Sequence, residues 1–108
     1  ISYNKITLNK NKGVIFMDIK ILGKDLTATE AIKEYVEKKL ERIQKYFEGE
    51  EIKASVTIKG EKNLQVAEMY ISVKSYNLKA VTETKDLYAS IDKDIDILEG
   101  QIRKLKKE

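Results

Sequence analysis

Basic and aromatic side chains gather on two stretches of the chain, and these residue types can bind a polyanion. Residues 30–47 form a predicted helix. One flank of its apolar stripe carries Tyr35, Lys39, Arg42 and Tyr46, and Lys38 and Lys45 lie near the side opposite the stripe. On residues 86–107 the basic side chains are Lys93, Arg103, Lys104, Lys106 and Lys107. Lysine and arginine bind phosphates, while tyrosine stacks on bases or hydrogen-bonds a ribose hydroxyl. The pattern suits an RNA-binding surface.

The sequence lacks the residues and motifs on which most catalytic and metal-binding sites depend. The sequence contains no histidine and no cysteine, which removes the usual general base, thiol nucleophiles, disulfides and the commonest metal ligands. It also contains no glycine-rich phosphate loop and no calcium-binding loop. We therefore expect no enzyme, no metal, no cofactor and no small-molecule substrate.

The composition predicts one soluble globular domain. Of 108 residues, 42% are hydrophobic and 36% are charged, which is enough apolar material for a single core. No apolar run approaches the roughly 20 residues of a membrane span, and the start lacks a secretory signal, so we expect a cytoplasmic protein without a membrane partner. The formal net charge of +3 alone does not argue for a nucleic-acid partner, so the arrangement of the charges must decide.

Two helices are predicted to position the basic residues. In residues 86–107 the apolar side chains recur three and four apart, at Leu87, Tyr88, Ile91, Ile95, Leu98, Ile102 and Leu105. Thr84 and Asp86 are suited to cap this helix. In residues 30–47 a second stripe consists of Ile32, Val36, Leu40, Ile43 and Phe47, with Thr27 or Thr29 as cap and Gly49 as stop. Tyr88 is expected in the core, whereas Tyr35 and Tyr46 lie at stripe edges.

Alternating stretches predict three strands, at residues 17–22, 52–59 and 66–76, and a tight turn at Asn77 leads into a fourth strand at residues 78–84. Residues 1–16 are expected to be an N-terminal extension, either artificially added or upstream of a true start at Met17. The domain then comprises residues 17–108 in the order β-α-β-β-β-α. Because short loops join the last three strands, they should form an antiparallel meander. We expect an α+β two-layer sandwich: a four-stranded sheet with both helices on one face and the other face wet.

The charges on these helices permit two interpretations. A solvated helix face with Glu–Lys pairs, and basic residues that compensate a helix dipole, would look the same. However, both helices cover one sheet face, so their basic flanks can join into one ridge, with acidic residues on the opposite flanks. That arrangement would let a nearly neutral chain bind phosphate.

The sequence resembles the ribosome hibernation-promoting factor family, also called ribosome-associated inhibitor, protein Y or sigma-54 modulation protein. The resemblance rests on MDIKILGKDLTATEAIKEYVEKKLERIQKYF (residues 17–47) and DLYASIDKDIDILEGQIRKLKK (residues 86–107). The family typically has a strand, a GK turn and a YVEKKL-like helix, then a DLYAAID helix that closes in a QLRKxK-like run. The resemblance extends over residues 17–107, and the DLYxxID element with its basic end is its more specific part.

This resemblance implies a fold similar to a double-stranded-RNA-binding domain. It also implies binding to the small ribosomal subunit and its rRNA, in the cleft for messenger and transfer RNA, where the family keeps ribosomes inactive in starvation or stationary phase. By position, it implies rRNA contacts for Lys38, Lys39, Arg42, Lys45, Lys93, Arg103, Lys104, Lys106 and Lys107. Tyr46 joins this set from its residue type and place.

The sequence departs from the family at two positions and leaves several alternatives open. Gly100 stands where the family commonly has a large, often basic residue, and Ser90 replaces the usual second alanine of YAAID. The chain corresponds either to a short family member or to the N-terminal domain of a long one that pairs ribosomes. A protein-binding modulator of a sigma factor and a generic structured-RNA binder are the alternative functions. Self-association through the exposed sheet face also stays open.

Overall fold

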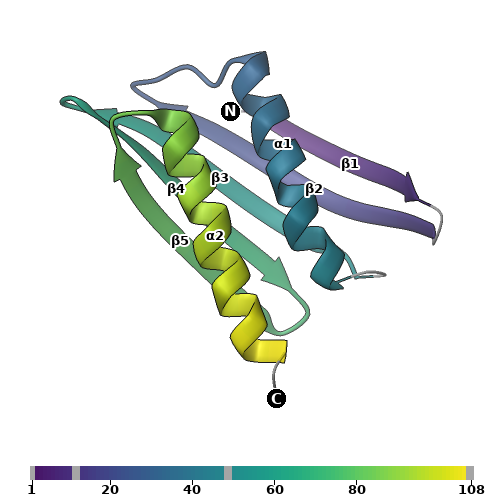
Figure 1. Cartoon of the computed structure of the whole chain (residues 1–108). Coiled ribbons are helices and arrows are strands. Elements are labelled where there is room, and N and C mark those ends of the chain that lie inside the picture. Colours follow the sequence, from purple (N-terminus) through teal and green to yellow (C-terminus); the bar gives the residue numbers. More distant parts are fainter. Residues whose placement is uncertain (1, 11–12, 48–49, 107–108) are drawn as a thin grey trace.

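A computed structural model describes residues 2–10, 13–47 and 50–106, with the backbone alone for residues 2–10, 13–16 and 106. Its elements follow the chain as β1 (Ser2–Lys10), β2 (Gly13–Lys24), α1 (Glu30–Gln44), a 3-10 turn (Lys45–Phe47), β3 (Ile52–Glu61), β4 (Leu64–Val73), β5 (Tyr76–Thr84) and α2 (Leu87–Lys106). Figure 1 shows α1 and α2 side by side over the sheet. No helix in the described ranges is long and apolar enough to cross a membrane.

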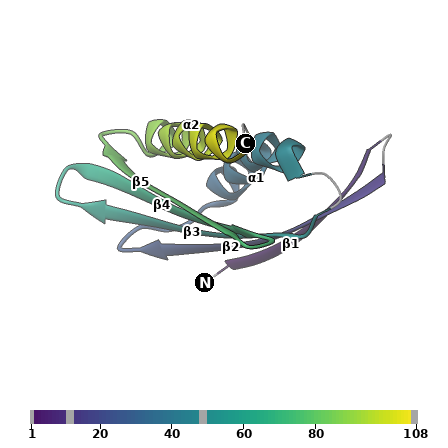
Figure 2. The same ribbon diagram turned by 90° about the horizontal axis from the view of Figure 1, so that it is seen from below.

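The strands form one sheet in the order β1-β2-β3-β4-β5. Strands β2 and β3 are parallel and are connected through α1, whereas β3, β4 and β5 form an antiparallel meander. Figure 2 shows both helices on one face of the curved sheet, with no element over the opposite face. The predicted α+β sandwich and its β-α-β-β-β-α order are therefore confirmed.

One further strand precedes this four-stranded unit. Strand β1 pairs antiparallel with β2 from Ser2 opposite Ile21 to Lys10 opposite Gly13, so β2 begins at Gly13 and not at Met17. The backbone of residues 2–10 satisfies its hydrogen bonds at the free edge of β2, which the sequence pattern did not reveal. The interpretation of residues 1–16 as an extension to a domain of residues 17–108 stays a prediction.

The core lies between the sheet and the helices. The inward side chains of the strands alternate as predicted: Met17, Ile19 and Ile21 on β2, Ile52, Ala54, Val56 and Ile58 on β3, Ala67, Met69, Ile71 and Val73 on β4, and Leu78 and Ala80 on β5. They pack against the predicted apolar stripes of both helices, in which Val36, Leu40, Ile95 and Leu98 are completely buried. This burial fixes the rotation of each helix, and with it the direction of each charged flank.

Helix starts and turns follow local chemistry. The Thr29 hydroxyl accepts a hydrogen bond from the Ile32 amide, and the Asp86 carboxylate accepts one from the Tyr88 amide. The turn predicted at Asn77 is instead formed by Lys74 and Ser75, because Val73 pairs with Tyr76 and Lys74 adopts a left-handed conformation with φ of 54°. Gly49, the predicted end of the first helix, lies outside the described residues.

Candidate nucleic-acid interface

The facing flanks of the two helices carry opposite charges. From α1 come Tyr35, Lys39, Arg42 and Tyr46, and from α2 come Asp92, Asp96 and Glu99; we call these seven residues the interhelix seam. Their spacings are matched, because each set recurs at three- and four-residue intervals along one helix flank. The seam therefore connects the two helices along the surface of the domain.

Glu99 organises one end of the seam. It is only 7% exposed, and its carboxylate accepts hydrogen bonds from the Arg42 guanidinium and, at 3.3 Å, from the Tyr46 hydroxyl. Arg103 lies 3.7 Å away from the same carboxylate, and Arg42 also donates to Asp96 at 3.3 Å. The hydrogen bond to Glu99 raises the pKa of the Arg42 guanidinium above its ordinary value. A nearly buried carboxylate is thus held by cations from both helices.

Asp92 organises the other end of the seam. It accepts a 2.7 Å hydrogen bond from the Tyr35 hydroxyl and lies 3.5 Å from the Lys39 ammonium. The hydrogen bond to Asp92 raises the pKa of Tyr35 to about 12. Tyr88 was predicted to lie in the core, and this is wrong. It is 38% exposed, and its ring makes a T-shaped contact with the Tyr35 ring, at 4.8 Å between centroids.

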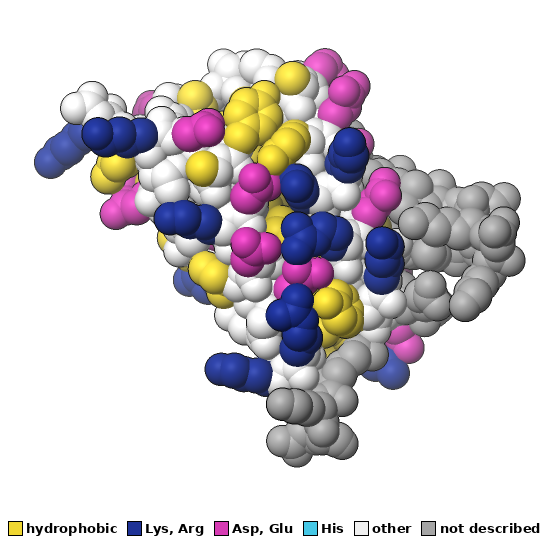
Figure 3. All heavy atoms as spheres, in the orientation of Figure 1, with side chains coloured by type: hydrophobic (Ala, Val, Ile, Leu, Met, Phe, Trp, Pro, Cys, Tyr) yellow, Lys and Arg dark blue, Asp and Glu magenta, His cyan; other side chains and the backbone are white. Residues whose placement is uncertain are grey.

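The expected separation of basic and acidic flanks is also wrong. The acidic flank of α2 faces the basic flank of α1, so acids are not sequestered away from the predicted ridge. Figure 3 shows basic and acidic side chains interleaved over the two helices. Helical periodicity places a charge on a flank, but it does not determine which flanks of two helices meet.

The predicted site residues therefore divide into three groups. Lys39, Arg42 and Tyr46 are partly buried and bonded within the seam. Exposed cations on the helix layer are Lys38, Lys45, Lys93, Arg103 and Lys104. Lys106 is the last residue of α2, but its side chain and all of Lys107 lie outside the described residues. No salt bridge within the described ranges involves Lys38, Lys45, Lys93 or Lys104, so these cations are free to meet an external anion.

The acidic half of the seam was missed as a functional element, although the sequence held a signal for it. Residues 35, 39, 42 and 46 and residues 92, 96 and 99 share the same three- and four-residue spacing but have opposite hydrogen-bonding and charge character. Complementary flanks of that kind are compatible with an interhelix contact when both helices cover one sheet face, and the packing of the helices decides whether the flanks meet.

The fold and this surface define a small α+β domain with a group of exposed cations on its helix layer. The chain belongs to the Sigma 54 modulation protein / S30EA ribosomal protein family, whose model matches residues 19–108. The resemblance seen in the sequence is thereby confirmed.

The chain is similar to proteins named ribosome hibernation promotion factor. That of Lactococcus lactis subsp. cremoris is 40% identical over 89 residues, a match that covers 80% of this chain and 48% of the relative. That of Staphylococcus aureus is 38% identical over 88 residues and covers 80% and 46%, respectively. The chain thus spans about half the length of the curated relatives it matches.

Two solved structures share the fold. The N-terminal domain of Thermus thermophilus Protein Y is 35% identical, with a TM-score of 0.75 over 80% of this chain and 94% of that domain. A ribosomal subunit interface protein from Coxiella burnetii has a TM-score of 0.76 over 83% of this chain and 98% of that chain. Because it is only 24% identical, the second likeness bears on the fold alone.

Proposed function

We propose that this domain binds ribosomes in the cytoplasm and helps to keep them inactive under stress. The observation that carries the proposal is the family match across residues 19–108, which includes both helices and their exposed cations. The domain would contact phosphates of small-subunit rRNA and occupy the cleft for messenger and transfer RNA. Occupancy alone would block initiation, so the function needs no catalytic residue.

The exposed cations are the first candidates for phosphate contacts. Lys38, Lys45, Lys93, Arg103 and Lys104 project to solvent. A phosphate can reach the four lysines without breaking a salt bridge among the described residues, whereas Arg103 lies beside Glu99. Arg42 has five N–H donors and a side chain that is 42% exposed, so it can bridge Glu99 and an rRNA phosphate at once. Lys39, Tyr46, Lys106 and Lys107 remain proposed contacts with the same partner.

The experiment is co-sedimentation of the purified protein with small subunits and with vacant ribosomes at low and high salt. We expect stoichiometric binding that weakens with salt, because each neutralised phosphate releases counterions. Messenger RNA and initiator transfer RNA should displace the protein if it occupies their cleft. No binding at low salt would contradict the proposal.

A matched pair of variants tests the surface. Replacing Lys38, Lys93 and Lys104 together by glutamate should abolish binding. The same replacement of Lys24, Lys62 and Lys85 should leave binding nearly unchanged. These lysines are also exposed, but they lie at the end of β2 and in the connections after β3 and β5. Both variants change the net charge equally, so an equal loss in both would assign the effect to net charge and contradict the helix surface. Each residue that contacts a phosphate should account for about one unit of the slope of the logarithm of the binding constant against the logarithm of the salt concentration.

The alternative functions predict different results. A modulator of a sigma factor would bind a protein with weak salt dependence and would not sediment with ribosomes. A generic structured-RNA binder would bind free duplex RNA as tightly as ribosomes. Either result would replace the proposal with that alternative.

A further inference from the structure

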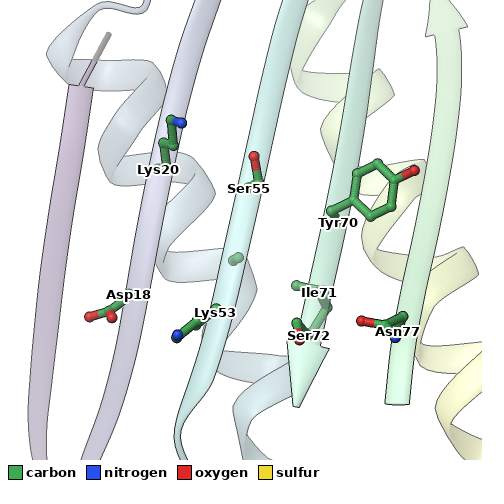
Figure 4. Close-up of a pocket in the computed structure, with 9 residues that line it drawn as sticks. Asp18, Lys20, Lys53, Ser55, Tyr70, Ile71, Ser72 and Asn77 are labelled. Carbon is green, nitrogen blue, oxygen red and sulfur yellow. The ribbon is translucent and has the colours of Figure 1, made fainter. Parts of the chain in front are cut away.

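The uncovered face of the sheet carries an ordered array of polar and basic side chains. Register places Lys20, Ser55, Tyr70 and Lys79 in one row across β2, β3, β4 and β5. The neighbouring row consists of Asp18, Lys53, Ser72 and Asn77. Figure 4 shows these side chains, except Lys79, on four adjacent strands. A shallow hollow of about 330 Å³ lies over the two rows.

Tyr70 is the dominant apolar group of this array. It is 50% exposed, although a tyrosine ring on a sheet is ordinarily packed against a neighbouring layer. The Lys79 ammonium lies 5.2 Å from the centroid of the Tyr70 ring. A cation beside an exposed ring combines the two features that single-stranded nucleic acid uses, namely a surface for a base and a charge for a phosphate.

The charge of the array favours an anionic occupant. Lys20 and Lys53 line the hollow with Asp18, the single acidic residue among its described lining residues, and Lys79 adds a third cation beside Tyr70. Within the described part of the chain, no salt bridge neutralises Lys20, Lys53 or Lys79. By contrast, Lys59 on the same face pairs with Glu68 at 2.7 Å. The unneutralised lysines are therefore concentrated around the tyrosine.

We propose that this face binds a short unpaired stretch of RNA. One base stacks on Tyr70, while Lys20, Lys53 and Lys79 meet phosphates, and Ser55, Ser72 and Asn77 offer hydrogen bonds to base edges and ribose hydroxyls. The first row spans three strand spacings, about 14 Å, a width comparable to sheets that stack two or three bases. This site lies opposite the helix cations and goes beyond the proposed function, because it needs no ribosome.

A second copy of the chain fits this face less well. In a two-fold symmetric contact the same patch occurs on both partners, so unneutralised lysines would approach one another. Among the side chains that the structure describes on the open face, Tyr70 and Val81 are the exposed large apolar groups that would offset this repulsion. Charge complementarity therefore favours RNA over self-association.

The test is fluorescence anisotropy of the purified protein with labelled ten-nucleotide oligouridylate and oligoadenylate at low salt. Tyr70→Ala should weaken binding about 5- to 150-fold, which corresponds to the roughly 1–3 kcal/mol of one stacked base. Tyr70→Phe should bind within about twofold of the original protein, because it retains the ring. Tyr88→Ala removes an exposed tyrosine from the helix layer and is the matched control; it should leave binding unchanged.

The helix variant separates this proposal from the previous one. The protein with Lys38, Lys93 and Lys104 replaced by glutamate should lose ribosome binding but keep oligonucleotide binding. A native circular dichroism spectrum shows that this variant is folded. The sheet site is overturned if the original protein does not bind the oligonucleotides, or if Tyr70→Ala binds as tightly as Tyr70→Phe. It is also overturned if sedimentation velocity shows a dimer that Tyr70→Ala dissociates, because a second copy would then occupy the face.

Discussion

Replacing Asp94 by asparagine should stabilise the protein at neutral and alkaline pH. Asp94 is on α2 and is completely buried against β5, where its Oδ2 atom has no hydrogen-bond partner among the described residues. Its Oδ1 atom lies 3.0 Å from the Thr82 hydroxyl, which is also 2.7 Å from the Ser90 carbonyl oxygen. One hydroxyl hydrogen cannot serve both acceptors. A protonated Asp94, or an asparagine, donates to Thr82 and lets Thr82 donate to Ser90.

The magnitude follows from the pKa of Asp94. Burial raises it from 3.8 to about 7, against the opposing effect of the Thr82 hydrogen bond, and the charge of Glu68 on β4 adds to the increase. A difference of about three pKa units corresponds to about 4 kcal/mol of unfolding free energy, as an upper bound, at pH values above 7. Asparagine avoids the cost of burying a charge and should recover a part of that amount.

The pH dependence has a definite sign. The pKa is higher in the folded than in the unfolded protein, so Asp94 imposes no cost below pH 4. As pH rises from about 4 to about 7 the unfolded state loses its proton first, and stability falls; above pH 7 the cost is constant. Between pH 5 and pH 8 this carboxyl should lower the unfolding free energy by about 2–3 kcal/mol.

Urea unfolding monitored by circular dichroism at pH 5 and pH 8 measures this effect. The stability advantage of Asp94→Asn over the original protein should be larger at pH 8 by about 2–3 kcal/mol. Glu83→Gln, which neutralises an exposed acid on β5, is the matched control and should show no such change. An advantage that is equal at the two pH values would mean that Asp94 does not change its charge between them, and the reasoning would be refuted.

Three further predictions concern α2 and the seam. Gly100→Ala should raise the unfolding free energy by about 1 kcal/mol in urea, because no atom lies within 4 Å of the added methyl group; a loss of stability would contradict the open surroundings. Arg42→Glu should lower the free energy of unfolding by about 2–3 kcal/mol, because the new carboxylate places a like charge beside buried Glu99. The 42% exposure of the Arg42 side chain moderates this loss. Asp96→Asn should change stability by less than about 0.5 kcal/mol but tighten ribosome binding, measured by co-sedimentation, because it removes the charge of one of the two acids that hold Arg42. Weaker binding would refute the idea of competition.

The layers of the fold could be predicted from the sequence, because the spacing of apolar residues along a helix or strand indicates which of its faces is buried. The alternation of Ile52, Ala54, Val56 and Ile58 and the stripe on α2 each predicted a buried face, and those faces were found buried. The sequence was insufficient for the turn, because Asn77 is a common turn residue, whereas Lys74 and Ser75, which form the turn, are not the Asn-Gly type of pair that marks a two-residue hairpin.

The candidate site was less predictable, because it depends on how the two helices are rotated and packed. Tyr88 follows the apolar stripe by sequence, but the stripe is slightly wider than the buried face and Tyr88 falls at its edge. Lys39 and Arg42 were correctly placed on a basic flank, yet their partners, Asp92 and Glu99, lie more than fifty residues away in the chain. Only the packing angle of the helices brings these charges together.

The seam changes how loss of binding in a variant should be interpreted. Arg42 and Lys39 hold acids of α2, so substituting them alters the fit of the two helices as well as the charge offered to RNA. Lys38 and Lys93 have no such internal role in the described structure, and their loss reports on an external anion alone. An rRNA phosphate that contacts Arg42 must share it with Asp96 and Glu99, and this competition lowers the net gain from that contact. We therefore expect the lysines on the outer surfaces of the helices to contribute more to the proposed binding than Lys39 and Arg42 do.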